Sequence, residues 1–357
     1  MKTRMLRGLL LVALGAAMFL CSCTDYSFNL DGLDDLDFNI FPDGNPTISH
    51  DGHIDIRHSL KGIARSSDRF VAVGGHVALI SSDGYSWEDS TTGDFDFNGE
   101  IVWNGRRFVA LGDSGRAYVS EDGVHWEETV NRPEAQLYGV AWSGQCFVLV
   151  GSSHQKRGGL ILSSFDGVVW TECVPEGADS ITVISQVIWS GKGFTALAYE
   201  DAAFRRPAVM KSRYGFNWHT TAPTGLGDIT LRTIVWDGKR YLGGGYVYDH
   251  PYTATTAVFA SANGSDWQRI TDSSDCTPIL RKMAWSGTRY VAIAPMYFSW
   301  GSNSLWESTD GIKWTKCSWE GWGPQDLKWC GDRFVAVGND LIVSSPDGLE
   351  WTQQTLP

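Results

Sequence analysis

Residues 101–126 read IVWNGRRFVALGDSGRAYVSEDGVHW, and this stretch holds two elements that recur along the chain. The later element is the frame Ser-x-Asp-Gly-x-x-Trp, which here runs from Ser120 to Trp126. The frame occurs seven times, always with its Gly and Trp, and its Trp residues are 37 to 49 residues apart. An internal period of this length indicates a repeat architecture. The seven frame tryptophans are Trp87, Trp126, Trp170, Trp218, Trp267, Trp314 and Trp351.

The earlier element is a pair of alternating apolar runs around a short turn. Asn104-Gly105 forms this turn in the second copy and Asp237-Gly238 in the fifth. Both dipeptides predict a two-residue type I′ hairpin, because that turn needs positive φ at both positions. A Trp ends the first run in copies two to seven, whereas Arg65 stands there in the first copy.

Each copy therefore contains four short strands: two around the hairpin, one leading into the Ser frame and one starting near its Trp. A four-stranded antiparallel unit of about 40–45 residues corresponds to one propeller blade. A single blade cannot cover both of its apolar faces, so the blades must pack into a ring. We therefore predict an all-β, seven-bladed β-propeller over residues 58–357. The sequence leaves open whether residues 48–57 add a strand to close the ring.

The Ser frame resembles the Asp-box, or BNR, repeat of sialidases, sortilin-type receptors and photosystem II assembly-factor propellers. The resemblance implies that the Asp and Ser side chains cap turn amides and that the Trp packs beneath them. One carboxylate at the same outer turn of each blade cannot converge with the others into an acid/base pair, so turn capping is the expected role. The carboxylates with this implied structural role are Asp83, Asp122, Asp166, Asp310 and Asp347.

The N-terminus has the pattern of a bacterial lipoprotein signal peptide. Basic residues precede an apolar run from Leu9 to Leu20, which is too short to span a bilayer. Leu20-Cys21-Ser22-Cys23 resembles a lipobox, which implies cleavage after residue 22 and lipidation of Cys23. The expected domains are a signal peptide at 1–22, the lipidated Cys and a tether at 23–57, and the propeller.

The tether and the net charge bear on location and partners. Residues 24–56 hold eight Asp and no Lys or Arg, which indicates a solvated spacer. We expect an extracytoplasmic protein of the bacterial cell envelope, held to a membrane by its N-terminal lipid alone. The formal net charge of −12 argues against nucleic acid, which requires a basic face. No motif for a cofactor or a metal is present, and the irregularly spaced cysteines predict mostly buried thiols with few disulfides.

We expect a ligand or partner on the face that carries the loops between the second and third strands of each blade. These loops are minimal in copies 1, 2 and 7 and longer in copies 3 to 6, where aromatic and charged residues gather. Exposed aromatics in a patch suit a protein or a glycan, although packing among themselves is an equally weighted explanation. The expected ligand-face residues are Arg205, Arg206, Tyr248, His250, Tyr297, Phe298, Trp300, Trp319 and Trp322.

The predicted function is therefore a non-catalytic scaffold or assembly protein, and no residue is assigned a catalytic role. The alternative is a sialidase-like glycosidase, which needs an arginine cluster, an acid and a Tyr–Glu pair. Its candidates are Arg157, Glu200, Asp201, Arg205, Arg206 and Tyr248. The arginines come from two adjacent loops rather than from around a channel, and sialidase catalytic domains have six blades, so the resemblance favours binding over catalysis.

Overall fold

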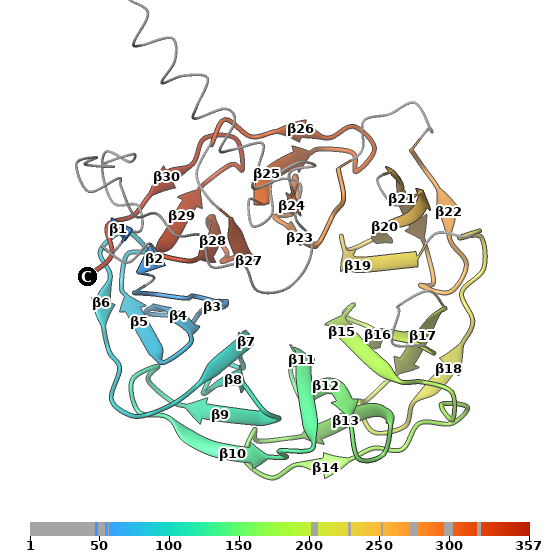
Figure 1. Ribbon diagram of the computed structural model, residues 1–357, viewed down its shortest axis with the longest axis horizontal. Helices are drawn as coiled ribbons and strands as arrows, with labels where there is room; N and C mark the ends of the chain where they lie inside the picture. Colours follow the sequence, from blue (N-terminus) through green and yellow to red (C-terminus); the bar gives the residue numbers. More distant parts are fainter. Residues whose placement is uncertain are drawn as a thin grey trace, which may run out of the picture.

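The computed structural model describes residues 47–48, 54–55, 57–200, 206–227, 230–250, 253–271, 278–295, 303–319 and 323–357. These residues form strands, turns and loops without a helix, so none offers an apolar helix of membrane-spanning length. Seven four-stranded antiparallel sheets surround a common axis (Figure 1). The prediction of an all-β, seven-bladed β-propeller is confirmed.

The blades take their strands in chain order. Blade 1 contains β3 (Gly62–Arg65), β4 (Phe70–Gly74), β5 (Val77–Ser81) and β6 (Glu88–Asp89), and blade 2 contains β7 (Phe97–Trp103), β8 (Phe108–Gly112), β9 (Arg116–Ser120) and β10 (Glu127–Asn131). Blade 3 contains β11 (Ala135–Trp142), β12 (Phe147–Ser153), β13 (Gly158–Ser164) and β14 (Thr171–Glu172), and blade 4 contains β15 (Val183–Trp189), β16 (Phe194–Tyr199), β17 (Pro207–Ser212) and β18 (His219–Thr221). Blade 5 contains β19 (Thr230–Trp236), β20 (Tyr241–His250), β21 (Thr253–Ser261) and β22 (Gln268–Arg269). Blade 6 contains β23 (Lys282–Trp285), β24 (Tyr290–Pro295), β25 (Asn303–Ser308) and β26 (Thr315–Lys316), and blade 7 contains β27 (Pro324–Trp329), β28 (Phe334–Gly338), β29 (Leu341–Ser345) and β30 (Thr352–Gln353).

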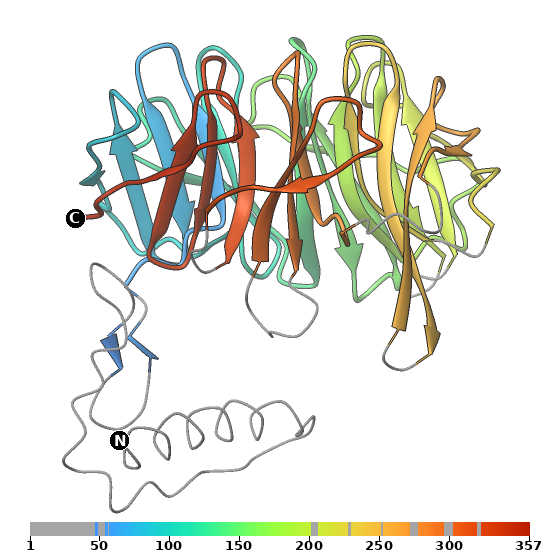
Figure 2. The same ribbon diagram turned by 90° about the horizontal axis from the view of Figure 1, so that it is seen from above.

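The four strands of a blade, called A to D, run from the axis to the rim, with strand A innermost (Figure 1). Because the strands are antiparallel, the A–B and C–D turns lie on one side of the ring and the B–C turns on the other. We call these sides the C–D face, which carries the seven Ser frames, and the B–C face. Figure 2 shows β20 and β21 projecting beyond the other strands on the B–C face.

Hydrophobic packing between blades holds the ring together. The described core divides into seven clusters, and each cluster combines buried side chains of two consecutive blades. One cluster joins Leu60, Ile63 and Phe70 of blade 1 to Val335 and Ile342 of blade 7. Since every blade buries both faces against its neighbours, no blade is expected to be stable alone.

The ring closes without a shared strand. Each four-stranded sheet uses four consecutive strands, whereas β1 (Thr47–Ile48) and β2 (Ile54–Asp55) pair only with each other. The segment before β3 instead binds the B–C turn of blade 7, where the Leu60 amide donates to the Gly338 carbonyl at 3.2 Å. The Asp340 carboxylate accepts the His58 amide at 2.8 Å. Within the described residues, the ring is therefore closed by main-chain and carboxylate contacts between the segment before β3 and blade 7, and not by an added strand.

The A–B turns differ from the predicted type I′ hairpins. The Trp103–Phe108 pair closes a loop of four residues, and Gly105 has a φ of 96° while Asn104 keeps a negative φ. The Asn104 Oδ1 accepts the amides of Arg106 and Arg107 at 2.8 and 2.6 Å, and Asp237 does the same in blade 5. The prediction of a two-residue turn was wrong, because the Asn or Asp side chain replaces a backbone acceptor and stabilises the wider loop.

Candidate functional site

The Ser frames build uniform turns on the C–D face. In blade 2, the Ser120 Oγ accepts the Gly123 amide at 2.8 Å, and the Asp122 Oδ1 accepts the amides of Val124 and His125 at 2.9 and 2.8 Å. The Trp126 indole lies beneath the turn and donates to the Gly123 carbonyl at 3.1 Å. Gly123 has a φ of 76°, and a Cβ added there would lie 2.5 Å from the Val71 side chain of blade 1. The frame therefore serves both the turn and the contact between blades.

The two frames without Asp keep the same shape by different means. In blade 5, the Asn263 Oδ1 accepts the amides of Ser265 and Asp266, both at 2.9 Å. In blade 4, Tyr214 cannot replace the Asp, and no side chain of the described residues accepts from these amides, yet the Trp218 indole still donates to the Gly215 carbonyl at 2.7 Å. The blade 4 turn therefore exposes the Tyr214 ring where most other frames have a negative charge.

The frame carboxylates titrate below their ordinary range. Hydrogen bonds from the amides of Ser86 and Tyr85 lower the pKa of Asp83 to about 2. Burial opposes the ionised form of Asp122, but hydrogen bonds from the His125 side chain and amide outweigh it and lower that pKa as well. The pKa values of Asp166, Asp310 and Asp347 are also lowered, with amide hydrogen bonds acting against partial burial.

We expect the propeller to lose stability as the pH falls from about 4 toward 2. A carboxylate whose pKa is lowered on folding contributes its full stabilisation above its ordinary pKa of 3.8, and loses it as protonation proceeds toward the folded value. Thermal unfolding followed by circular dichroism across this range measures the effect. The variant Asp122→Asn is the matched control, because Asn263 already caps such a turn, and it should flatten part of the pH dependence. A melting midpoint that stays constant from pH 4 to 2 would contradict this role of the carboxylates.

Most of the ligand face predicted from the sequence lies outside the described residues. This applies to the side chains of Arg205, Tyr248, His250, Tyr297, Phe298, Trp300 and Trp322, and the predicted lipidation site Cys23 also lies outside the described residues. The backbone of Tyr248 and His250 belongs to β20, where His250 pairs with Thr253. The long loop expected in blade 5 is thus largely an extension of the β20–β21 hairpin on the B–C face (Figure 2).

Two members of that predicted face are described. Trp319 is half-buried and packs against the cluster between blades 6 and 7, which includes Cys317 and Leu341. It thus contributes to the core as well as to the surface. Arg206 is exposed and forms an ion pair with Glu200 across the B–C loop of blade 4, with 3.4 Å between Nη1 and Oε2.

The candidates for glycoside hydrolysis are not brought together in the described part of the chain. Glu200 is paired with Arg206, while Arg157 lies in the B–C turn of blade 3 with a φ of 49°. Asp201 and Arg205 lie outside the described residues. Within the described ranges, no group of three His, Cys, Asp or Glu side chains is arranged to hold a metal ion. No observation therefore favours the glycosidase alternative.

A large groove lies on the opposite, C–D face, between blades 3, 4 and 5. Its volume is about 1,490 Å³, and it runs from the A–B turn of blade 3 to Tyr241 of blade 5. The walls include Phe165 of the blade 3 frame, and Tyr214 and Phe216 of the blade 4 frame. We call this feature the blade 3–4 groove.

The rim of the blade 3–4 groove exposes large apolar side chains. Phe165 is 69% exposed and Tyr214 is 64% exposed. Phe165 lies against Phe216 with 4.9 Å between ring centroids, and Val169 beside it is 70% exposed. Exposed apolar groups that gather in this way mark a site of interaction more often than scattered ones do.

The charge of the groove is opposite to that of the chain. Its lining contains Lys192, Lys211 and Arg213 but no Asp or Glu, although the whole protein has a formal net charge of −12. Arg213 lies over the Tyr214 ring, with 5.3 Å from its guanidinium carbon to the ring centroid. The groove therefore combines aromatic rings with positive charge.

Sequence reasoning missed this groove because it treated the seven Ser frames as uniform. The signal lay in the variable positions of the third and fourth frames, which hold Phe165, Val168, Val169, Tyr214 and Phe216. At the positions of Phe165, Val169 and Tyr214 the other five frames hold mostly polar or charged residues, whereas the position of Val168 and Phe216 is apolar or aromatic in four of them. Apolar side chains at exposed turn positions of two adjacent repeats indicate a surface, because packing does not require them there.

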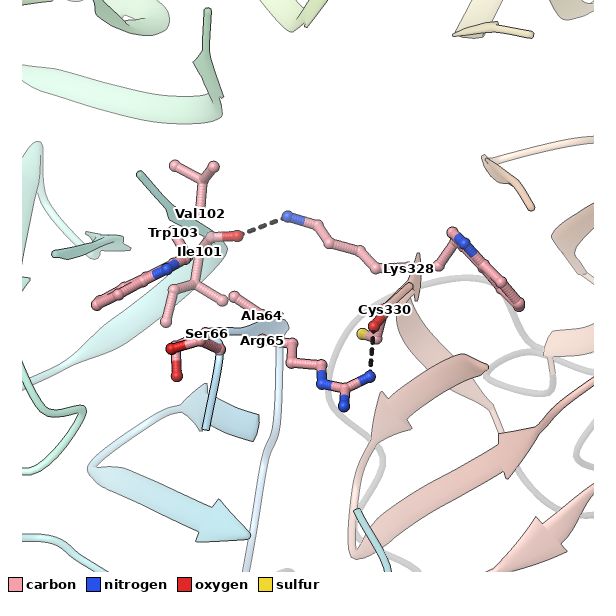
Figure 3. A pocket seen from close by; sticks show the side chains of 10 residues that line it. Ala64, Arg65, Ser66, Ile101, Val102, Trp103, Lys328 and Cys330 are labelled. Atoms are coloured by element: carbon pink, nitrogen blue, oxygen red, sulfur yellow. Dashed lines mark hydrogen bonds between the residues drawn. The ribbon is translucent and has the colours of Figure 1, made fainter. Parts of the chain in front are cut away.

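A second hollow of about 430 Å³ lies where strand A of blades 7, 1 and 2 reaches the C–D face (Figure 3). It is lined by Arg65, Trp103, Lys328 and Trp329, among others. We call it the channel-mouth pocket. Cys330 also lines it, and burial raises the pKa of that thiol to about 12. Like the other three cysteines of the described ranges, Cys330 is buried and free, as the sequence predicted for most of them.

These features define a seven-bladed β-propeller with two hollows on its C–D face. No protein-family model and no curated protein matches the sequence. Among solved structures, YCF48 from Cyanidioschyzon merolae is similar, with a TM-score of 0.59 and 15% identity over 83% of this chain and 97% of that chain. A chain of the mitotic checkpoint complex gives 0.56 and 12% over 88% and 97%. The acylaminoacyl peptidase of Pyrococcus horikoshii gives 0.55 and 10% over 84% and 52%. At these identities the similarity establishes the fold alone.

Proposed function

We propose that this chain is a lipid-anchored protein of the bacterial cell envelope whose propeller binds a protein partner without catalysing a reaction. The blade 3–4 groove is the docking site. The observation that carries this proposal is the pair of exposed rings, Phe165 and Tyr214, at the rim of a groove that has no acidic residue in its lining.

The composition of the groove suits a protein more than a small molecule. Interface centres are enriched in aromatic residues and Arg and depleted in Glu and Asp. The groove offers Phe165, Tyr214 and Phe216 together with Arg213, and its volume exceeds that of ordinary small-molecule pockets. A partner segment with apolar and acidic side chains would bury the rings and pair with the cations.

The rigidity of the site also supports binding. The frame turns of blades 3 and 4 are held by Trp170 and by Trp218, whose indole is only 1% exposed. Both turns therefore present their rings with little conformational entropy left to lose on association. A similar propeller fold within the mitotic checkpoint complex is compatible with such a role in an assembly.

The anchor follows from the lipobox-like sequence at Cys23 and the acidic tether. The chain joins the ring at residues 57–60, which bind the B–C turn of blade 7. Residues 57–60 therefore lie on the B–C face, and the blade 3–4 groove opens on the other face. This arrangement would leave the groove accessible to a partner in the envelope while Cys23 stays in the membrane.

Photo-crosslinking in cells tests the docking site. A photoreactive phenylalanine analogue at Phe165 should crosslink a discrete partner, whereas the same analogue at Leu349 should not. Leu349 is the matched control, because it is 40% exposed in the frame of blade 7, away from the groove. Against the purified partner, Phe165→Ala with Tyr214→Ala should weaken binding at least about 30-fold, as for interface hot spots.

Equal crosslinking from both positions, or unchanged affinity of the double variant, would contradict the docking site. If a purified glycan binds to the protein and the double variant loses this binding, the ligand of the groove is a carbohydrate and not a protein. Metabolic labelling with a fatty-acid analogue tests the anchor separately: the label should be incorporated into the protein and lost in Cys23→Ala.

A further inference from the structure

We propose that the channel-mouth pocket binds a small carboxylic acid with a flat aromatic body. This site is separate from the blade 3–4 groove and does not depend on the proposed function. It exists where the repeat is broken: Arg65 stands at the end of strand A in blade 1, where every other blade has a Trp.

The six tryptophans and Arg65 make the same kind of contact. Each Trp packs at an angle against the aromatic residue that begins strand B of its own blade, as Trp103 does against Phe108 and Trp329 against Phe334, with ring centroids 4.4 and 4.8 Å apart. The Arg65 guanidinium lies 4.7 Å from the centroid of Phe70 in the same way. A guanidinium is smaller than an indole, and the space left between Trp103 and Trp329 is the pocket.

Arg65 retains hydrogen-bonding capacity toward this space. Its Nη1 donates to the Cys330 carbonyl at 2.9 Å and to the Asp332 Oδ1 at 2.6 Å. Its Nε and Nη2 donate to no acceptor within the described residues. The side chain of Arg65 is 31% exposed, so the remaining N–H groups are accessible to a ligand. The edge of a guanidinium can donate two parallel hydrogen bonds to a planar carboxylate.

Lys328 supplies a second cation. It reaches from blade 7 across the mouth of the channel and donates to the Ile101 carbonyl of blade 2 at 2.5 Å, above Arg65 in the view of Figure 3. An ammonium has three donors, and this is its one hydrogen bond to the described residues. The carboxylates nearest to the two cations, Asp332 and Asp326, do not line the pocket.

The lining therefore combines two cationic donors with two indoles and contains no acidic side chain. Its volume of about 430 Å³ lies in the range of small-molecule sites. A carboxylate would accept from the remaining N–H groups of Arg65, the Lys328 ammonium would supply a second positive charge, and an aromatic ring attached to the carboxylate would lie against an indole of the lining. A neutral ligand would gain no charge-assisted hydrogen bond from Arg65 or Lys328, and an aliphatic polyol would gain less from the indole rings.

Calorimetric titration of the folded protein with benzoate tests this inference. Benzoate should bind saturably, whereas benzamide, its uncharged match, should bind at least about tenfold more weakly. Glucuronate carries the same carboxylate on a sugar ring and should also bind more weakly than benzoate. Binding of benzamide as tight as that of benzoate, tighter binding of glucuronate, or no saturable binding of benzoate would overturn the proposal.

The variant Arg65→Trp restores the residue of the other six blades, so it should fold while filling the pocket, and it should lose benzoate binding. Lys328→Met provides a second test that keeps the side-chain volume. Asp332→Asn removes the carboxylate that competes for Arg65 and should tighten binding about threefold or more. Tyr214→Ala, in the blade 3–4 groove, is the control and should not change it. Retained benzoate binding in both Arg65→Trp and Lys328→Met would refute the site.

Discussion

Replacing Lys282 with Met is expected to lower the free energy of unfolding by about 3 to 5 kcal/mol. The Lys282 ammonium donates to the Asp326 carboxylate at 2.7 Å and to the Glu100 carboxylate at 2.9 Å. The residues come from strand A of blades 6, 7 and 2, so this ion triad links blade 2 to two blades that are not its neighbours. The Asp326 side chain is 1% exposed, and removal of the ammonium would leave a buried carboxylate without its closest counter-charge.

The titration of the triad is consistent with this expectation. Burial opposes the charged form of Lys282, but the carboxylates of Asp326 and Glu100 outweigh it and raise the pKa of the ammonium above its ordinary value. A raised lysine pKa contributes stability that is complete below pH 10.5 and is lost only at higher pH. At neutral pH the full contribution is therefore present.

Chemical denaturation monitored by tryptophan fluorescence measures the loss. The control is the triple variant Lys282→Met, Glu100→Gln, Asp326→Asn, which removes all three charges together and should recover most of the stability. Recovery is expected because breaking a buried ion pair costs more than replacing it entirely. A loss of less than about 1 kcal/mol in Lys282→Met, the range of exposed ion pairs, would show that water already screens the triad.

The second large effect concerns the frame Trp of blade 4. Trp218→Ala is expected to cost about 3 to 5 kcal/mol, as is usual for a large aromatic side chain removed from a core. Trp218 is 1% exposed, packs in the cluster between blades 3 and 4, and donates to the Gly215 carbonyl at 2.7 Å. Because Tyr214 replaces the capping Asp in this turn, we expect the indole to contribute more to the stability of the turn than the Trp does in other frames.

Trp351→Ala in blade 7 is the matched control. Trp351 occupies the same position in its frame but is only half-buried, and its bond to the Gly348 carbonyl is longer, at 3.3 Å. Its turn also keeps Asp347 as a cap. Trp351→Ala should therefore cost about half as much as Trp218→Ala or less. Equal losses at the two positions would mean that the frames contribute uniformly, regardless of burial and capping.

Loss of Trp218 should also affect the proposed docking site. The turn that Trp218 supports carries Tyr214 and Phe216, and both line the blade 3–4 groove. A folded Trp218→Ala protein should crosslink less from Phe165, whereas Trp351→Ala should not. This comparison separates a general loss of stability from a local loss of the groove.

The fold was predictable because its signals are local and repeated. Alternating apolar residues, a Gly that needs positive φ and a Trp at a fixed offset recur seven times, and each copy specifies four strands without reference to the others. The turn type was not predictable from Asn104-Gly105 alone. There, the side-chain acceptor stabilised a loop that the dipeptide preference does not distinguish from a tighter one.

The sequence by itself determined the number of blades, the order of their strands and the unusual place of Arg65, because each follows from the local pattern of one repeat or from comparing the repeats along the chain. Only the tertiary structure brought Lys282 to Glu100, or opened a pocket beside Arg65, because these contacts depend on the distance between repeats once the ring is closed. The same holds for the blade 3–4 groove. Its rings lie in two separate frames, and they form one surface because neighbouring blades bury their apolar faces against each other.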